Sequence, residues 1–233
     1  MKQMIGKNLF SLMRIKNINK KELIMDIQRM LVTIPGIIIG FTIHEYCHAL
    51  AAYKLGDTTV IEDGRLTLDP MKHIDIMGLV FIIIAGFGWA KPVRFSPSML
   101  KRPKRDKAII AAVGPFSNLL LGILFIFIIK SLWLLPIDNA KTIDIIGFIM
   151  DILYYWAFTN IALFVFNMFP IPPLDGSHIF LSGLNIGYET EQKIMRVGST
   201  LFFIIIIVQM SSGYTILPIG AMVNKIISFM LTL

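Results

Sequence analysis

A short run in the first apolar stretch has residue types and spacing suited to zinc chemistry. It reads His44-Glu45-Tyr46-Cys47-His48, an H-E-x-x-H pattern. On a helix His44 and His48 are one turn apart on the same face, so both imidazoles can reach one zinc ion, while Glu45 lies beside them for acid/base work on a bound water. A charge at the centre of a bilayer costs roughly 2.5–3.5 kcal/mol, which argues against an accidental match. The alternative is that the histidines only form hydrogen bonds between helices and Glu45 lies at the membrane interface.

A catalytic zinc site usually has three protein ligands and one open position, so a third ligand is needed. The best candidate is Asp175, near the end of the sequence N-M-F-P-I-P-P-L-D-G at residues 167–176. The prolines must end the preceding helix, and irregular backbone at membrane depth implies a polar cavity or a cover of protein. The alternative is a helix-ending turn at the interface, in which Asp175 caps the next helix.

The composition predicts an integral membrane protein. The chain has 233 residues, 55% hydrophobic and 16% charged, with a mean hydropathy of +0.72, whereas soluble domains carry about 25% charged residues. The single cysteine excludes a disulfide framework and a cysteine-based structural zinc site. The net charge of +7 fits basic loops beside anionic lipid. We therefore expect the lipid bilayer, and no nucleic acid, as a partner.

Four apolar stretches are long enough to cross about 30 Å of hydrocarbon, which takes roughly 20 helical residues. They cover residues 30–53, 108–129, 145–169 and 197–217. Residues 76–90 are too few to cross and include three glycines, which predicts a re-entrant or half-inserted segment. The expected fold is an all-α polytopic membrane protein, with a basic, amphipathic N-terminal segment at 1–28 and a single membrane-embedded metalloprotease domain at 29–233.

Residues 57–69 alternate around Asp63-Gly64, which predicts a small β-hairpin beside the metal-binding helix. The free edge of such a hairpin could pair with the extended backbone of a substrate. A plain loop is the alternative.

Three motifs follow one another along the chain: H-E-x-x-H at 44–48, G-P-x-x-N at 114–118 and N-x-x-P-x-P-x-L-D-G at 167–176. Together they resemble the site-2 protease family of intramembrane zinc metalloproteases, in its compact bacterial branch without a PDZ domain. The resemblance implies one Zn²⁺ per chain, with Glu45 activating water. It also implies these roles: His44, His48 and Asp175 as zinc ligands, and Asn118 and Asn167 as polar groups near the scissile carbonyl.

The three ligands can meet at one depth only if residues 54–107 begin and end on the same side of the membrane. This requires that segment 76–90 does not cross. Residues 54–107 contain 10 of the 22 basic residues, so the positive-inside rule predicts that the site opens towards the cytoplasm. The resemblance implies a multi-pass protein of the bacterial cell membrane. Seven basic residues before position 30 favour that same side for the N-terminus, so the sidedness of the N-terminus stays open.

The sequence therefore predicts an intramembrane zinc endopeptidase that cleaves a transmembrane or membrane-proximal segment of a membrane protein, with Glu45 as the general base. The alternative is a non-proteolytic zinc-binding scaffold or chaperone that binds transmembrane helices, against which the intact Glu45 argues. A metal transporter is less favoured, because it would need ligands along a path through the bilayer. The substrate's identity and the oligomeric state are unknown from the sequence.

Overall fold

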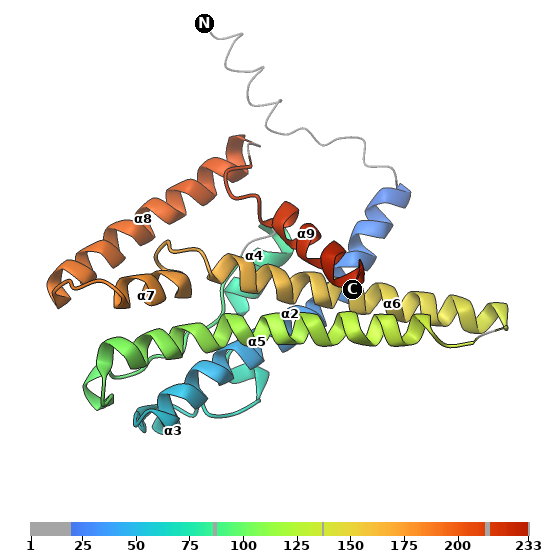
Figure 1. The fold of residues 1–233 in the computed structure, drawn as a ribbon. Helices are drawn as coiled ribbons and strands as arrows, with labels where there is room; N and C mark the ends of the chain where they lie inside the picture. The colour runs from blue at the N-terminus through green and yellow to red at the C-terminus, as the bar shows by residue number, and fades with distance from the viewer. Residues whose placement is uncertain (1–19, 86–87, 137, 213–214, 233) are drawn as a thin grey trace, which may run out of the picture.

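The computed structural model describes residues 20–85, 88–136, 138–212 and 215–232, and helices dominate it (Figure 1). The long helices are α2 (Lys20–Lys54), α5 (Pro103–Trp133), α6 (Ala140–Asn167) and α8 (Tyr188–Ser212). The shorter ones are α3 (Thr59–Glu62), α4 (Ile76–Ala85), α7 (Asp175–Ser182) and α9 (Ile219–Thr232), with two 3₁₀ turns, η1 (Pro70–Lys72) and η2 (Pro97–Met99).

The predicted all-helical architecture with four membrane spans is confirmed, because the four long helices are long and apolar enough to cross a bilayer. Each covers most or all of its predicted stretch. Large apolar side chains face outward on these helices, for example Leu120, Phe127 and Ile207, as lipid-facing surfaces require. The predicted segment 1–28 lies mainly outside the described residues, and from Lys20 onward it is part of α2.

Two of the long apolar helices, α5 and α6, run side by side and form the centre of the bundle (Figure 1). Their buried contact includes Phe125 and Ile129 from α5 and Ile161 from α6. The helix α9 packs Val223 and Ile227 into the same cluster. This 14-residue helix was not predicted as a separate element, because it is shorter than a membrane span.

Helix α2 packs closely on α6 through two glycines spaced by four residues. An added Cβ at Gly36 would lie 2.6 Å from Trp156 Cδ1, and one at Gly40 would lie 2.8 Å from Asn160 Oδ1. Small residues with this spacing let helix backbones approach in membranes. The close approach brings the polar group of Asn160 to the half of α2 that carries His44 and His48.

Helix α4 is too short to cross a bilayer, as predicted for residues 76–90. Its 10 residues span about 15 Å, roughly half the hydrocarbon thickness. The segments on either side of α4 pair through an isolated antiparallel bridge between Ile74 and Ala90 and a 2.8 Å hydrogen bond from Lys91 N–H to the His73 carbonyl. The chain thus returns to the end of α2, where α5 begins.

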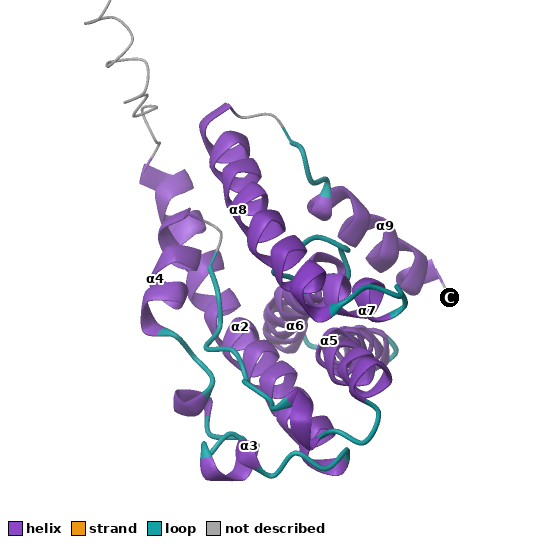
Figure 2. Ribbon diagram, turned by 90° about the vertical axis from the view of Figure 1, so that its left-hand side faces the viewer, coloured by secondary structure: helices purple, strands orange, loops and turns teal. Residues whose placement is uncertain are grey.

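The predicted β-hairpin at residues 57–69 is wrong: in this segment the structure has helix α3 and a loop, and Figure 2 draws no strand there. The Asp57 side chain accepts a 3.0 Å hydrogen bond from Thr59 N–H, which starts a turn. Gly64, at φ +63°, ends α3 in a Schellman motif, with hydrogen bonds from Gly64 N–H to the Ile61 carbonyl and from Arg65 N–H to the Val60 carbonyl. The Asp63-Gly64 pair therefore ends a helix instead of forming the turn of a hairpin.

Candidate metal centre

Two helices far apart in the sequence bring three candidate ligands together. Of the three residues, His44 and His48 lie on α2 and Asp175 is the first residue of α7. The two Nε2 atoms are 2.9 Å apart, and Asp175 Oδ2 lies 3.1 Å from His44 Nε2 and 3.4 Å from His48 Nε2. Within the described residues, this is the group of acidic, histidine or cysteine side chains close enough to share one metal ion.

The tautomer of His48 follows from its hydrogen bond to the backbone of α5. Its Nδ1 lies 2.6 Å from the carbonyl oxygen of Ile110. Because a carbonyl only accepts, Nδ1 carries a proton, and Nε2 is the ring atom that remains to bind a metal ion.

The tautomer of His44 follows from a side chain of α5. Its Nδ1 lies 2.6 Å from Asn118 Oδ1. The amide orientation is set by its other end, where Asn118 Nδ2 donates to the Gly40 carbonyl at 3.0 Å and to Asn160 Oδ1 at 3.1 Å. Oδ1 is therefore the acceptor, His44 Nδ1 carries a proton, and His44 Nε2 likewise remains to bind a metal ion.

Two imidazole nitrogens and one carboxylate oxygen thus face one another in a buried place, an arrangement suited to a cation between them. Asp175 Oδ2 is buried and accepts no hydrogen bond within the described part of the chain. A proton would fill one of the three gaps, whereas a metal ion accepts from all three atoms. Ligands about 2.0–2.1 Å from a tetrahedral zinc lie roughly 3.3 Å apart, close to the observed 2.9–3.4 Å. The residues present therefore fit zinc.

The backbone near Asp175 approaches the end of α6 closely. At Gly176 an added Cβ would lie 2.5 Å from the Phe169 carbonyl oxygen, so glycine permits the tight turn that aims Asp175 at α2. On the outer side, Pro172 packs against Gly198 of α8. Helix α6 ends at Asn167, before the Pro-rich segment, as its prolines predicted, and this segment packs against α8 beside the carboxylate.

The carboxylate of Glu45 is held by a backbone group from the segment after α4. Glu45 is buried, 6% exposed, and its Oε2 accepts a 2.9 Å hydrogen bond from Val93 N–H. A buried carboxylate needs such a partner. The bond fixes the orientation of Glu45, and sequence reasoning did not find it because a backbone donor leaves no signal in the residue type.

Arg65 links the two chain segments that lead to Val93. Its guanidinium donates to the carbonyls of Lys72 at 2.5 Å, Lys91 at 3.1 Å and Pro92 at 3.3 Å. One side chain therefore fixes both paired segments next to the residue that contacts Glu45.

Asn118 is brought to the metal centre, and Asn160 joins it as a residue that the sequence analysis missed. Both side chains are fully buried. Because both N–H groups of the Asn118 amide are already used by Gly40 and Asn160, its contacts favour a role in orienting His44. A signal for Asn160 existed: it lies seven residues before Asn167 in an apolar span, and a buried amide in a membrane helix needs partners.

Asn167 does not join this network. It is the last residue of α6, and its Nδ2 donates to the Leu163 carbonyl of the same helix at 3.0 Å. Its predicted role near a scissile carbonyl therefore stays a prediction.

His178, one turn after Asp175, is not part of the ligand group. Burial lowers its pKa, and the nearby charge of Lys107 lowers it further. The side chain is therefore neutral at pH 7.

Replacing Asn118 with leucine is expected to weaken zinc binding about 10- to 100-fold, because the partner that fixes the His44 tautomer is lost. Zinc affinity measured by competition with a chelator checks this. Thr159→Val is the control, since that hydroxyl donates to the Tyr155 carbonyl of its own helix and should leave affinity unchanged. Native zinc affinity in Asn118→Leu would contradict the assigned role.

Comparison with known proteins identifies relatives of this chain. The model of peptidase family M50 matches residues 134–209. A Bacillus subtilis protein named "Putative zinc metalloprotease YwhC" is 33% identical over 184 residues, which cover 78% of this chain and 82% of the relative. A Mycolicibacterium smegmatis protein named "Putative zinc metalloprotease Rip2" is 29% identical over 182 residues, 76% of this chain and 66% of the relative. No solved structure gives a significant match.

Proposed function

The chain belongs to peptidase family M50, the zinc metalloproteases of the site-2 protease type, and we propose that it is an endopeptidase that cleaves membrane proteins within or next to a transmembrane segment. The observation that carries this proposal is that two histidine nitrogens of an apolar helix and the carboxylate oxygen of Asp175 lie close enough to share one metal ion. The same apolar helix also holds a buried glutamate, Glu45. Such a set is suited to hydrolysis by a metal and a general base.

In the proposed reaction His44, His48 and Asp175 hold one zinc ion. Bound zinc supplies a Lewis acid that polarises the peptide carbonyl and acidifies water. Glu45 takes the proton from the attacking water and then delivers it to the amine leaving group. The backbone bond from Val93 to Glu45 Oε2 leaves the other carboxylate oxygen, Oε1, to handle the proton.

The two asparagines have separate proposed roles. Asn118 orients His44 through the 2.6 Å contact to its Nδ1. Asn167 is proposed to donate to the developing oxyanion of the scissile peptide, which requires its Nδ2 to leave the Leu163 carbonyl. The second role is the weaker of the two, because its present partner lies in its own helix.

The substrate class and sidedness rest on the membrane setting of the site. The candidate ligands lie on or beside helices able to cross a bilayer, so the accessible peptide bonds are those of membrane proteins. We propose a single-pass substrate and a site open to the cytoplasm, supported by the 10 basic residues between positions 54 and 107.

The experiment is cleavage of tagged single-pass membrane proteins by the purified chain in detergent. We expect cleavage that stops when a chelator strips the metal and resumes when zinc is restored. Binding of the substrates without cleavage, by protein that contains one zinc per chain, would instead support the scaffold alternative.

Arg65→Gln is expected to lower kcat about 10- to 100-fold with zinc content and KM unchanged, because Val93 would no longer be held against Glu45 and small misplacements of catalytic groups are costly. Cleavage kinetics and metal analysis check this. If Arg65 acts through Glu45, the two changes are not additive: Arg65→Gln should cost little more in a Glu45→Asp background. A rise in KM alone would contradict this role and point to substrate binding.

A further inference from the structure

The basic residues at the start of α5 fall on two faces with different partners. On one face, Lys107 forms an ion pair with Glu191 of α8, and Lys104 Nζ lies 3.5 Å from the Leu184 carbonyl and from Asn185 Oδ1. Lys107 therefore connects α5 to α8, and Lys104 connects it to the chain between α7 and α8. Their charge is thus partly satisfied within the protein.

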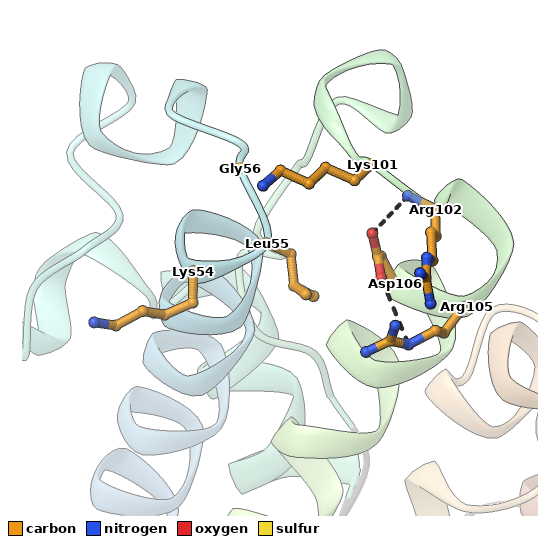
Figure 3. Close-up of a pocket in the computed structure, with 7 residues that line it drawn as sticks. All are labelled: Lys54, Leu55, Gly56, Lys101, Arg102, Arg105 and Asp106. Atoms are coloured by element: carbon orange, nitrogen blue, oxygen red, sulfur yellow. Dashed lines mark hydrogen bonds and ion pairs between the residues drawn. The ribbon is translucent and has the colours of Figure 1, made fainter.

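The other face borders a hollow of about 360 Å³ between the end of α2 and the start of α5 (Figure 3). This face carries most of the remaining charge of the basic run. The lining residues are Lys54, Leu55, Gly56, Lys101, Arg102, Arg105 and Asp106, four cations and one anion, which leaves a formal charge of +3.

That excess charge has little compensation from the protein. Asp106 is 3% exposed. Its Oδ2 accepts a 2.8 Å hydrogen bond from the backbone N–H of Arg102, and its Oδ1 lies 4.0 Å from Arg105 Nε (Figure 3). Within the described part of the chain, the side chains of Lys54, Lys101 and Arg102 form no ion pair. Positively charged side chains that surround one hollow and lack acidic partners attract an anion to it.

The position of the hollow indicates which kind of anion would bind there. It lies where two helices able to span the membrane meet, at the end of α2 and the beginning of α5, which places it at the membrane–water interface. Leu55 adds an apolar side chain to the lining. Basic pockets between transmembrane helices at this depth suit phospholipid headgroups. A soluble anion would gain nothing from the apolar neighbour.

We propose that this hollow binds the phosphate headgroup of an anionic phospholipid, with Lys101, Arg102 and Arg105 contacting the phosphate from the α5 side. Leu55 and Gly56 line the hollow on the α2 side, where the Lys54 side chain points away from the other cations (Figure 3). The bound headgroup would link the two helices close to the metal centre. Asp106 is one helical turn before Ile110, whose carbonyl holds His48, and Ile110 packs with Ala49 and Leu100 in one buried cluster.

The test measures binding of phosphatidylglycerol, compared with phosphatidylcholine, to the zinc-loaded full chain in detergent micelles, together with its thermal unfolding midpoint in mixed micelles of the same lipids. We expect phosphatidylglycerol to bind and to raise the midpoint. Lys101→Gln and Arg102→Gln should each weaken phosphatidylglycerol binding about fivefold, from roughly 1 kcal/mol per basic residue.

The matched control is Lys104→Gln, which removes the same charge from the same basic run on the face that contacts the α7–α8 connection. It should leave phosphatidylglycerol binding within twofold of native. An equal loss in Lys104→Gln would show a diffuse surface attraction and overturn the proposal. Inorganic phosphate or glycerol phosphate that raises the midpoint as much as the lipid would also overturn it, because the ligand would then be a soluble anion. Neither readout depends on peptide cleavage.

Discussion

Glu45→Gln is expected to lower kcat for peptide cleavage by about 10²- to 10⁴-fold while zinc stays bound, because the amide cannot accept the proton of the attacking water. The fold should survive: the amide oxygen of glutamine can still accept the hydrogen bond that Val93 N–H donates to Glu45. Cleavage rates with a tagged membrane substrate, together with metal analysis of the same preparation, measure both quantities.

The matched control for that variant is Glu62→Gln, which makes the same carboxylate-to-amide change at an exposed position of α3. It should leave both rate and zinc content at native values. Native cleavage by Glu45→Gln would contradict the role of Glu45 as general base, and loss of zinc would show that the glutamate supports the metal instead.

Gly114→Ala is expected to abolish both zinc binding and cleavage. An added Cβ at this position would lie 2.5 Å from His48 Cε1, 2.8 Å from His44 Nε2 and closer still to His48 Nε2. The rings cannot turn away, because the Nδ1 atoms are held by Ile110 and Asn118. Helix α5 must therefore move away from α2, at a cost of about 1–3 kcal/mol for overpacking, and the ligand atoms separate. Zinc content and cleavage rate measure the result.

Alanine substitutions at two other glycines distinguish loss of the metal centre from general destabilisation of the helix bundle. Gly122→Ala, on the same helix, would place its Cβ 2.5 Å from Ile161 Cγ1, so it should destabilise the bundle while zinc binding persists in folded protein. Gly147→Ala in α6 meets nothing within 4 Å and should be neutral. If Gly114→Ala kept native zinc content, the close packing of α5 on the two imidazoles would be wrong.

The spacing rules of helices explain why two of the candidate ligands could be placed together from the sequence. Two histidines four residues apart must share a face whatever the rest of the fold does, and the proline run before Asp175 had to end a helix. Hydropathy alone located the four spans, because membrane helices need a minimum apolar length. The convergence of Asp175 on α2 depends instead on the packing of α7 against α5. The sequence singled out Asp175 through its proline run and its motif but could not place it in space.

Other parts of the fold and of the candidate site depend on interactions that the residue types alone do not reveal. The Asp63-Gly64 pair is compatible with a hairpin turn and with a helix end, and the capping bonds around Gly64 decided for the helix. The backbone donor for Glu45 comes from the segment after α4, far from it in sequence. Gly114 belongs to a motif whose residues could be matched, but its function is visible only when His48 is packed against it.

The most direct test of the account is X-ray absorption at the zinc edge of the purified protein, with Asp175→Ala measured beside it. We expect one zinc per chain with imidazole nitrogen and oxygen ligands, no sulfur at about 2.3 Å, and loss of zinc in the variant. Cys47 is the only cysteine and adjoins His48, so a sulfur signal would mean a different ligand set. A sulfur signal, or zinc retained unchanged in Asp175→Ala, would contradict the proposed metal centre.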